Sequence, residues 1–100
     1  MLLILTASPA FAQESENDLK TQAESLFNQD KFVEATSYYL RLIALNPRST
    51  EYNYKYGTCL LFNSLKKQDA FKYLKYSITD PSINPEAYFY LGKAYHLNFQ

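Results

Sequence analysis

The side chains that most often carry catalysis or bind metals are scarce in this 100-residue sequence. His96 is the one histidine, and no carboxylate lies three or four residues to either side of it, so a base or metal ligand there lacks a partner on its own helix face. Cys59 is the one cysteine, and a single distant histidine does not make it a nucleophile. Two glycines, Gly57 and Gly92, are too few for a phosphate-cradling loop. We therefore expect a non-enzyme with no catalytic residue, no cofactor and no metal site.

The charged residues argue against a nucleic-acid partner. The chain has 10 Lys and Arg against 10 Asp and Glu, whereas binding to a phosphate backbone needs an excess of basic charge. Residues 14–34 carry a net charge of −4 and residues 35–100 a net charge of +4. We interpret this asymmetry as an ordinary solvated surface; the alternative is a head-to-tail attraction between neighbouring domains. A small basic patch is interpreted in the same way as a solvated helix face, formed by Lys66, Lys67, Lys72 and Lys75.

The first twelve residues are predicted to lie outside the fold. Residues 1–12 read MLLILTASPAFA, in which a short apolar run is followed by small residues at Ala10 and Ala12. Small residues at these positions before Gln13 are typical of a secretory cleavage site, although the basic n-region is missing. We interpret residues 1–12 as a signal-peptide remnant; the alternative is a disordered tail. The apolar run is far shorter than the roughly 20 residues that span a bilayer, so we expect no direct membrane span.

The spacing of apolar residues predicts five helices separated by polar turns and prolines. The first helix lies between the cap Ser15 and the turn 28–30, and the second between that turn and Asn46-Pro47. The third lies between the cap 49–50 and the turn 63–67, and the fourth between that turn and the loop 80–83. The fifth runs from Asn84 to Leu97. The third helix is the least obvious, because Tyr52, Tyr54 and Tyr56 alternate with polar residues as in a strand. We assign a helix because Gly57 and Leu60 continue the helical spacing.

The fifth helix has a small residue at its centre. Asn84 is a good N-cap, and Pro85 suits the first helical position because its missing N–H has no partner there. Glycine inside a helix costs about 1 kcal/mol relative to alanine, so Gly92 indicates that another backbone comes close at that point. An apolar stripe at helical spacing faces the core, made of Ala87, Leu91, Ala94 and Tyr95.

Similar residues recur at a nearly constant interval, which indicates an internal repeat. Ala23 and Gly57 are 34 residues apart, and Gly57 and Gly92 are 35 apart. Three further pairs have the same interval, Ala35 with Ala70, Tyr39 with Leu74, and Pro47 with Pro81. A period near 34 residues with two helices in each unit is the tetratricopeptide period.

The chain resembles tetratricopeptide repeat (TPR) proteins over nearly all of residues 18–97. The family's first helix has an aromatic residue, then Leu-Gly, then Tyr, which Tyr88, Leu91-Gly92 and Tyr95 match. Its second helix has the pattern matched by Ala35, Tyr39, Leu42 and Pro47. The resemblance implies an all-α fold, a right-handed α-solenoid of antiparallel helix hairpins with about two and a half repeats. The implied TPR domain covers residues 13–100, with repeats at about 16–47, 48–82 and, incomplete, 84–100.

Residues 46–62 and 85–97 resemble more closely the N-terminal repeats of envelope proteins from Bacteroidetes-type bacteria. In those proteins the TPR block precedes a β-propeller and an OmpA-like, peptidoglycan-binding domain, and some belong to outer-membrane secretion assemblies. The resemblance implies an exported scaffold in the periplasm or at the outer membrane. It also implies anchoring domains beyond Gln100.

Repeat proteins of this family bind protein or peptide partners on the concave surface lined by the first helix of each unit. By family register, nine residues face that surface: Lys20, Glu24, Asn28, Tyr54, Thr58, Phe62, Phe89, Lys93 and His96. The alternative for the three aromatic residues among them is packing in the seams between helices, which one amphipathic stripe predicts equally well. Lys20 and Lys93 with Asn28 suit a peptide carboxylate or backbone.

No helix follows the fifth one to complete the third unit, so Leu91 and Tyr95 are expected to leave an apolar patch. We therefore expect either that Gln100 is a truncation point or that another chain covers this patch. The predicted function is a non-catalytic interaction module that binds a protein or peptide. One alternative is a structural spacer in a peptidoglycan-anchored outer-membrane or secretion-associated protein, and another is an accessory domain of an enzyme.

Overall fold

The computed structural model describes residues 15–99, and this part of the chain is helical, with no strand. The helices are α2 (Glu16–Asn28), α3 (Phe32–Leu45), α4 (Thr50–Leu61), the short 3-10 helix η1 (Lys67–Asp69), α5 (Ala70–Ser77) and α6 (Glu86–Asn98). The predicted all-α class and all five helices, including the helix over the alternating tyrosines, are confirmed. The proposed signal-peptide remnant, residues 1–12, lies outside the described residues.

Side-chain caps start three of the helices where the sequence predicted them. A capping side chain satisfies a backbone N–H that has no carbonyl partner in the first turn. The acceptor and donor pairs are Ser15 Oγ with Asp18 N (3.0 Å), Ser49 Oγ with Tyr52 N (3.1 Å) and Asn84 Oδ1 with Glu86 N (2.9 Å). Pro85, between the last cap and α6, has helical dihedral angles. At the end of α2 the chain reverses through Asp30, whose φ of 60° is in the left-handed region that Asp tolerates better than most residues.

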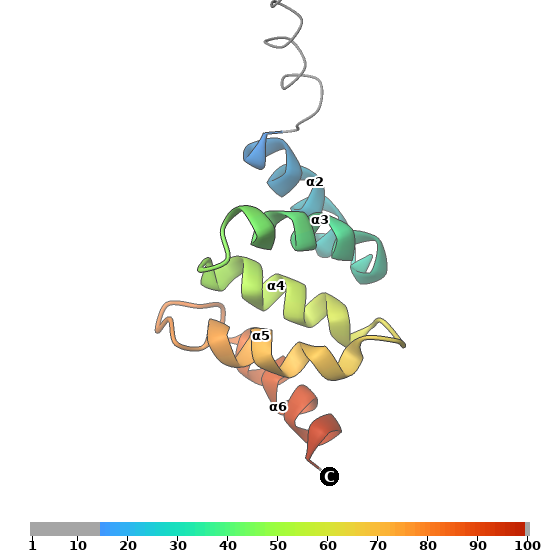
Figure 1. Ribbon diagram of the computed structural model, residues 1–100, viewed down its shortest axis with the longest axis vertical. Coiled ribbons are helices and arrows are strands. Elements are labelled where there is room, and N and C mark those ends of the chain that lie inside the picture. The colour runs from blue at the N-terminus through green and yellow to red at the C-terminus, as the bar shows by residue number, and fades with distance from the viewer. Residues whose placement is uncertain (1–14, 100) are drawn as a thin grey trace, which may run out of the picture.

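The five α-helices form a stack in chain order, and each packs most extensively against its neighbour in sequence (Figure 1). Alternate helices are also joined by side chains. Tyr52 on α4 donates a hydrogen bond from its hydroxyl to Glu16 of α2 (2.6 Å), and the Tyr54 hydroxyl reaches Glu86 of α6 (3.4 Å). The result is a linear stack in which contacts join both neighbouring and alternate helices.

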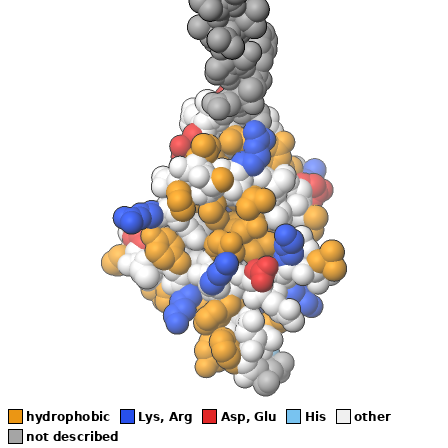
Figure 2. Space-filling view, in the orientation of Figure 1, with side chains coloured by type: hydrophobic (Ala, Val, Ile, Leu, Met, Phe, Trp, Pro, Cys, Tyr) orange, Lys and Arg blue, Asp and Glu red, His pale blue; other side chains and the backbone are white. Residues whose placement is uncertain are grey.

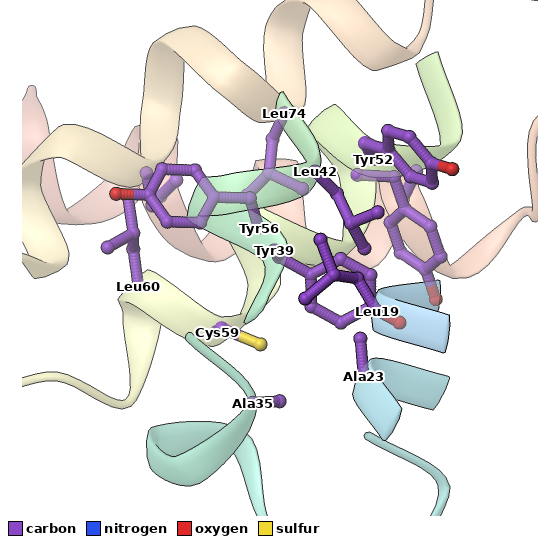
Figure 3. Close-up of a cluster of buried hydrophobic side chains, with 14 residues drawn as sticks. Leu19, Ala23, Ala35, Tyr39, Leu42, Tyr52, Tyr56, Cys59, Leu60 and Leu74 are labelled. Atoms are coloured by element: carbon purple, nitrogen blue, oxygen red, sulfur yellow. The ribbon is translucent and has the colours of Figure 1, made fainter. Parts of the chain in front are cut away.

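The core runs through the stack as a continuous set of side chains from successive helices, in which α2, α3, α4 and α5 all take part (Figure 3). Helix α4 lies at its centre and has eight buried residues, whereas α2 and α6 have two each. Because α4 is covered on nearly every side, its tyrosines at 52, 54 and 56 are all buried. This burial explains why its sequence does not show the single apolar stripe of a surface helix.

The two glycines differ in their surroundings. A Cβ added at Gly57 would lie 2.7 Å from Leu74 Cγ and 3.3 Å from the Ala70 carbonyl oxygen, so α5 approaches α4 closely there. A Cβ at Gly92 would have no such neighbour within 4 Å among the described residues. The prediction of a close backbone approach at Gly92 is therefore wrong for this part of the chain, because no helix lies beside that face of α6.

The predicted apolar stripe of α6 is only partly covered. Ala87 and Ala94 are fully buried against the stack, and Leu91 is half-buried. Tyr95, in contrast, is an exposed residue, as are Tyr88 on the same helix and Phe99, the C-terminal cap residue. The expected apolar patch on α6 is present at Tyr95.

Candidate functional site

Four of the nine predicted partner-binding residues line one groove at the α6 end of the stack. Its volume is about 690 Å³, and it lies between the end of α4 and one side of α6. The lining residues are Phe62, Phe89, Lys93 and His96 from the predicted set, together with Leu61, Tyr90, Gly92 and Leu97. The four residues that were not predicted come from positions next to predicted ones, and Leu97 stands one helical turn after Lys93.

Helix geometry brings these residues together. Phe89, Lys93 and His96 follow one another at intervals of four and three residues, so they share one side of α6. Phe62 is the C-terminal cap residue of α4, and its backbone N–H donates to the Cys59 and Leu60 carbonyls, which directs the chain out of the helix. The groove is therefore built by two rigid helices rather than by loops.

Three aromatic rings, those of Phe62, Phe89 and Tyr90, form part of the groove wall. The Phe62 ring stacks on Phe32 with centroids 4.5 Å apart and an interplanar angle of 17°, and it meets Tyr90 edge-on at 6.5 Å. Phe89 packs against Tyr90 with centroids 5.2 Å apart. These contacts fix the orientation of the rings, and edge-to-face and stacked pairs are worth about 0.5–1.5 kcal/mol beyond their buried area.

The groove is open, apolar and positively charged at one point. Phe62 and Phe89 are 48% and 59% exposed, so both rings are available to a partner. The Lys93 ammonium lies 5.1 Å from the centroid of the Phe89 ring, within range of a cation–π interaction. Figure 2 shows one face of the molecule, on which apolar side chains gather over its middle with Lys and Arg around them. The groove between α4 and α6 suits a partner that has apolar side chains next to an acidic group or a backbone carbonyl group.

Tyr54 and Thr58 do not face a partner, contrary to the prediction. Tyr54 is 2% exposed, and its ring packs edge-on against Phe27 with centroids 6.1 Å apart. Thr58 is fully buried and donates a hydrogen bond from its hydroxyl to the Tyr54 carbonyl oxygen (2.8 Å). Both residues therefore belong to the seam between helices, which was the alternative interpretation for Tyr54. The reason is that α2 and α6 both reach across this side of α4.

The three predicted residues of α2 do not line the groove. The Lys20 ammonium lies 3.8 Å from a carboxylate oxygen of Glu51 on α4 and so makes an ion pair within the stack. Glu24 is half-buried and Asn28 is exposed at the end of α2. The prediction that Lys20 and Lys93 together with Asn28 hold a peptide carboxylate or backbone is not supported, because only Lys93 of these three lines the groove.

A second, smaller hollow of about 320 Å³ lies beside the start of α4 and includes Asp80, which the sequence did not single out. The Asp80 carboxylate accepts hydrogen bonds from the Thr50 hydroxyl (2.7 Å) and from the Ser82 backbone N–H (2.9 Å) and hydroxyl (2.8 Å). The bond from Thr50, followed by those from Ser82, lowers the pKa of the Asp80 carboxyl. Asp80 therefore ties the loop before α6 to the first turn of α4.

The one thiol has no access to solvent. Cys59 is fully buried in the core (Figure 3). Burial raises the pKa of the Cys59 thiol to about 12, against a smaller opposite effect of the Lys55 charge. The thiol is therefore protonated at neutral pH, and a protonated thiol is a poor nucleophile.

Within residues 15–99, no three His, Cys, Asp or Glu side chains gather closely enough to hold a metal ion. None of the helices in this range has the length and apolar character needed to cross a bilayer. Comparison of the chain with protein-family models, with curated proteins and with solved structures gave no match. The groove and the arrangement of the helices are therefore the features from which a function can be inferred.

Proposed function

We propose that this chain is a non-catalytic protein–protein interaction module that binds a protein or peptide segment in the groove between α4 and α6. The observation that carries this proposal is the groove itself, in which exposed Phe62 and Phe89 stand beside Lys93 on rigid helices. Protein-binding surfaces are enriched in exposed aromatic side chains and are depleted in charge at their centre. An extended segment with apolar side chains and an acidic group fits this chemistry best.

The proposal includes a TPR-like, right-handed solenoid of helix hairpins as the scaffold. Two pairs of residues that stand 35 positions apart on α3 and α5 have the same burial, which supports a repeated unit. Ala35 and Ala70 are both fully buried, and so are Tyr39 and Leu74. In such arrays each unit contacts only its neighbours, so that the stacked helices present an extended surface to a partner.

We place the module in an exported envelope protein, in the periplasm or at the outer membrane. The support for this location is the signal-like sequence of residues 1–12 and the resemblance to TPR-containing envelope proteins. Cell fractionation followed by determination of the intact mass and the N-terminal sequence tests it. A mature chain that begins at Gln13 is the expected result, and a cytosolic chain that retains Met1 would contradict export.

Site-specific photo-crosslinking tests the groove directly. A benzoylphenylalanine is placed at Phe89 in the full chain and expressed in the native cells, with Val33 as the matched control. Val33 is also exposed, but it lies on α3 and outside the groove. We expect a discrete adduct from position 89 and none from position 33. Lys93→Glu should weaken the adduct several-fold while the melting temperature is unchanged, because Lys93 is exposed and its charge faces the groove.

The second candidate function is a structural spacer between other domains of an envelope protein. The linear order of the stack, in which each helix packs mainly on its neighbours in sequence, favours this alternative. A spacer needs no groove partner, so it predicts no adduct at position 89 in a correctly folded chain. A spacer also predicts that Lys93→Glu leaves the function of the protein in cells unchanged, whereas shortening the stack impairs that function. Tyr54→Ala is unsuitable for either test because Tyr54 is buried.

A further inference from the structure

One face of α6 repeats a face of α4 that another helix covers. Tyr88, Gly92 and Tyr95 on α6 stand 35 residues after Asn53, Gly57 and Leu60 on α4. Spacings of four and three residues put each set on one side of its helix. On α4, Asn53 and Leu60 are 5% and 1% exposed; on α6, Tyr88 and Tyr95 are 54% and 58% exposed.

The covering helix of α4 is α5, and it fits Gly57 closely. A Cβ at Gly57 would lie 2.7 Å from Leu74 Cγ, 3.2 Å from the Leu74 nitrogen and 3.3 Å from the Ala70 carbonyl oxygen. Ala70 and Leu74 are both fully buried. The pair of helices therefore needs a glycine on one side and, on the other, an alanine with a leucine four residues later.

The corresponding position on α6 also has a glycine, Gly92, but no described helix packs against it. Glycine in the middle of a helix is less favourable than alanine, and at Gly92 no atom of a packed helix takes up the space that the absent Cβ leaves. The tyrosines on either side of it are exposed aromatic rings. Gly92 therefore leaves room for the backbone of an approaching helix, and the exposed rings on either side of it offer apolar contact area.

We propose that the α6 face formed by Tyr88, Gly92 and Tyr95 binds an α-helix that presents an alanine and, four residues later, a leucine, as α5 does to α4. Among residues 15–99, α6 is the last helix of the stack (Figure 1), and no described helix covers it at Gly92 as α5 covers α4 at Gly57. A second copy of α6 lacks this pattern, because its own face offers tyrosines beside the glycine. Gly92 also lines the edge of the groove, whereas Tyr88 and Tyr95 do not. The proposed helix site therefore adjoins the groove, and the inference goes beyond the proposed function.

An extension of the chain tests the proposal without an unidentified partner. A copy of residues 66–80 is joined directly after Gln100. Gln100 stands 35 residues after Leu65, so the copied alanine and leucine fall at the same distance in sequence from Gly92 as Ala70 and Leu74 do from Gly57. The control extension has aspartate at both copied positions, which keeps the length and removes the apolar contact.

Three results are expected. The extended chain melts at a higher temperature than the parent chain, on the order of 5 °C, and the control extension does not. Gly92→Ala raises the melting temperature of the parent by about 4 °C, because alanine is the better helix former. In the extended chain the same substitution lowers the melting temperature, because its Cβ meets the added helix.

Other outcomes overturn the proposal. No gain in melting temperature on extension, or the same gain from the control extension, excludes a specific helix site. An equal rise from Gly92→Ala in both chains shows that the added helix does not lie against Gly92. A parent chain that sediments as a dimer and becomes monomeric with Gly92→Ala shows that a second copy occupies the face. These measurements use the chain without a groove partner. A negative result in them therefore does not decide the crosslinking test of the groove.

Discussion

A single glycine on α4 sets how closely α4 and α5 approach. In Gly57→Ala the new Cβ would lie 2.7 Å from Leu74 Cγ and 3.2 Å from the Leu74 backbone nitrogen, so α5 has to move outward. Overpacking of a core costs about 1–3 kcal/mol, which exceeds the gain of about 1 kcal/mol from the better helix former. We expect the free energy of unfolding to fall by about 1–2 kcal/mol, measured by urea titration.

Gly92→Ala is the matched control for this prediction, because the same chemical change is made at the equivalent position of α6. No atom of a neighbouring helix in the described part of the chain would meet the new Cβ. The free energy of unfolding should therefore rise, by up to about 1 kcal/mol. A destabilisation of similar size at both positions would contradict the assignment of Gly57 as the contact point.

Two buried tyrosines differ in whether the hydroxyl group has a hydrogen-bond partner among the described residues. The Tyr52 hydroxyl donates to a Glu16 carboxylate oxygen at 2.6 Å, and hydrogen bonds to charged groups are worth about 1.5–3 kcal/mol. The Tyr39 hydroxyl is buried and has no hydrogen-bond partner in residues 15–99. We expect Tyr52→Phe to reduce the free energy of unfolding by about 1–2 kcal/mol, and Tyr39→Phe to leave it unchanged or raise it.

The same urea titration checks both tyrosine variants, and Glu16→Gln serves as a further control. Because Glu16 is the acceptor for Tyr52, the double variant Tyr52→Phe, Glu16→Gln should lose less stability than the sum of the single losses. Strict additivity would contradict the pair. A large loss in Tyr39→Phe would show that the Tyr39 hydroxyl has a partner.

Residue type and spacing predicted only part of the groove, because exposure depends on neighbours that spacing does not reveal. Tyr54 and Phe89 stand at equivalent positions 35 residues apart, and both were assigned to the partner surface. Tyr54 is buried because α6 and α2 cross its side of α4, whereas no described helix crosses Phe89. Phe62, Lys93 and His96 line the groove, and their role in binding stays a prediction.

At the scale of the elements, the sequence was more informative. Local signals such as the Ser15 and Ser49 caps and the Asn46-Pro47 stop act within one or two turns, so they can be read without knowledge of the fold. Helix α4 was harder, because alternating tyrosines also suit a strand. Its position at the centre of the stack removes the contrast between an inner and an outer face, and that position is a tertiary property.

The loop between α5 and α6 is tied to the start of α4 by Asp80, which makes this junction sensitive to acid. The pKa of the folded carboxyl is lowered from 3.8, mainly by the hydrogen bond from the Thr50 hydroxyl. A lowered folded pKa stabilises the fold above the unfolded value, and this contribution is lost as the pH falls through the folded pKa. We expect Asp80→Asn to melt below the wild type at pH 6 and the difference to shrink as the pH falls below 3.8.

Thr50→Val is the companion variant for the acid prediction, since it keeps the Asp80 carboxylate and removes the first of its donors. Its melting temperature should also lie below that of the wild type at pH 6, with a difference that narrows in acid. The measurement is a series of thermal melts between pH 2.5 and 6, where each variant is compared with the wild type at the same pH. A constant difference across this range would show that Asp80 does not contribute through its ionised form.

For the whole molecule, a stack in which each helix packs mainly on its neighbours should be most stable at its centre. Helix α4 has eight buried residues and contacts α3 and α5 directly, while α2 and α6, with two buried residues each, lie at the two ends. Local opening needs less free energy where fewer apolar contacts are broken. We expect native-state hydrogen exchange, followed by mass spectrometry, to be slowest in α4 and fastest in α2 and α6.

This gradient distinguishes a stack held by nearest neighbours from a domain that opens as one unit. In the stack, Gly57→Ala weakens the α4–α5 contact and should speed exchange in α5 and α6 more than in α2, because α2 packs on the far side of α3. In a single cooperative unit, every helix would lose protection by the same factor. Uniform acceleration in all five helices would therefore exclude the nearest-neighbour description and, with it, the argument that α6 can receive a further helix without change in the rest of the fold.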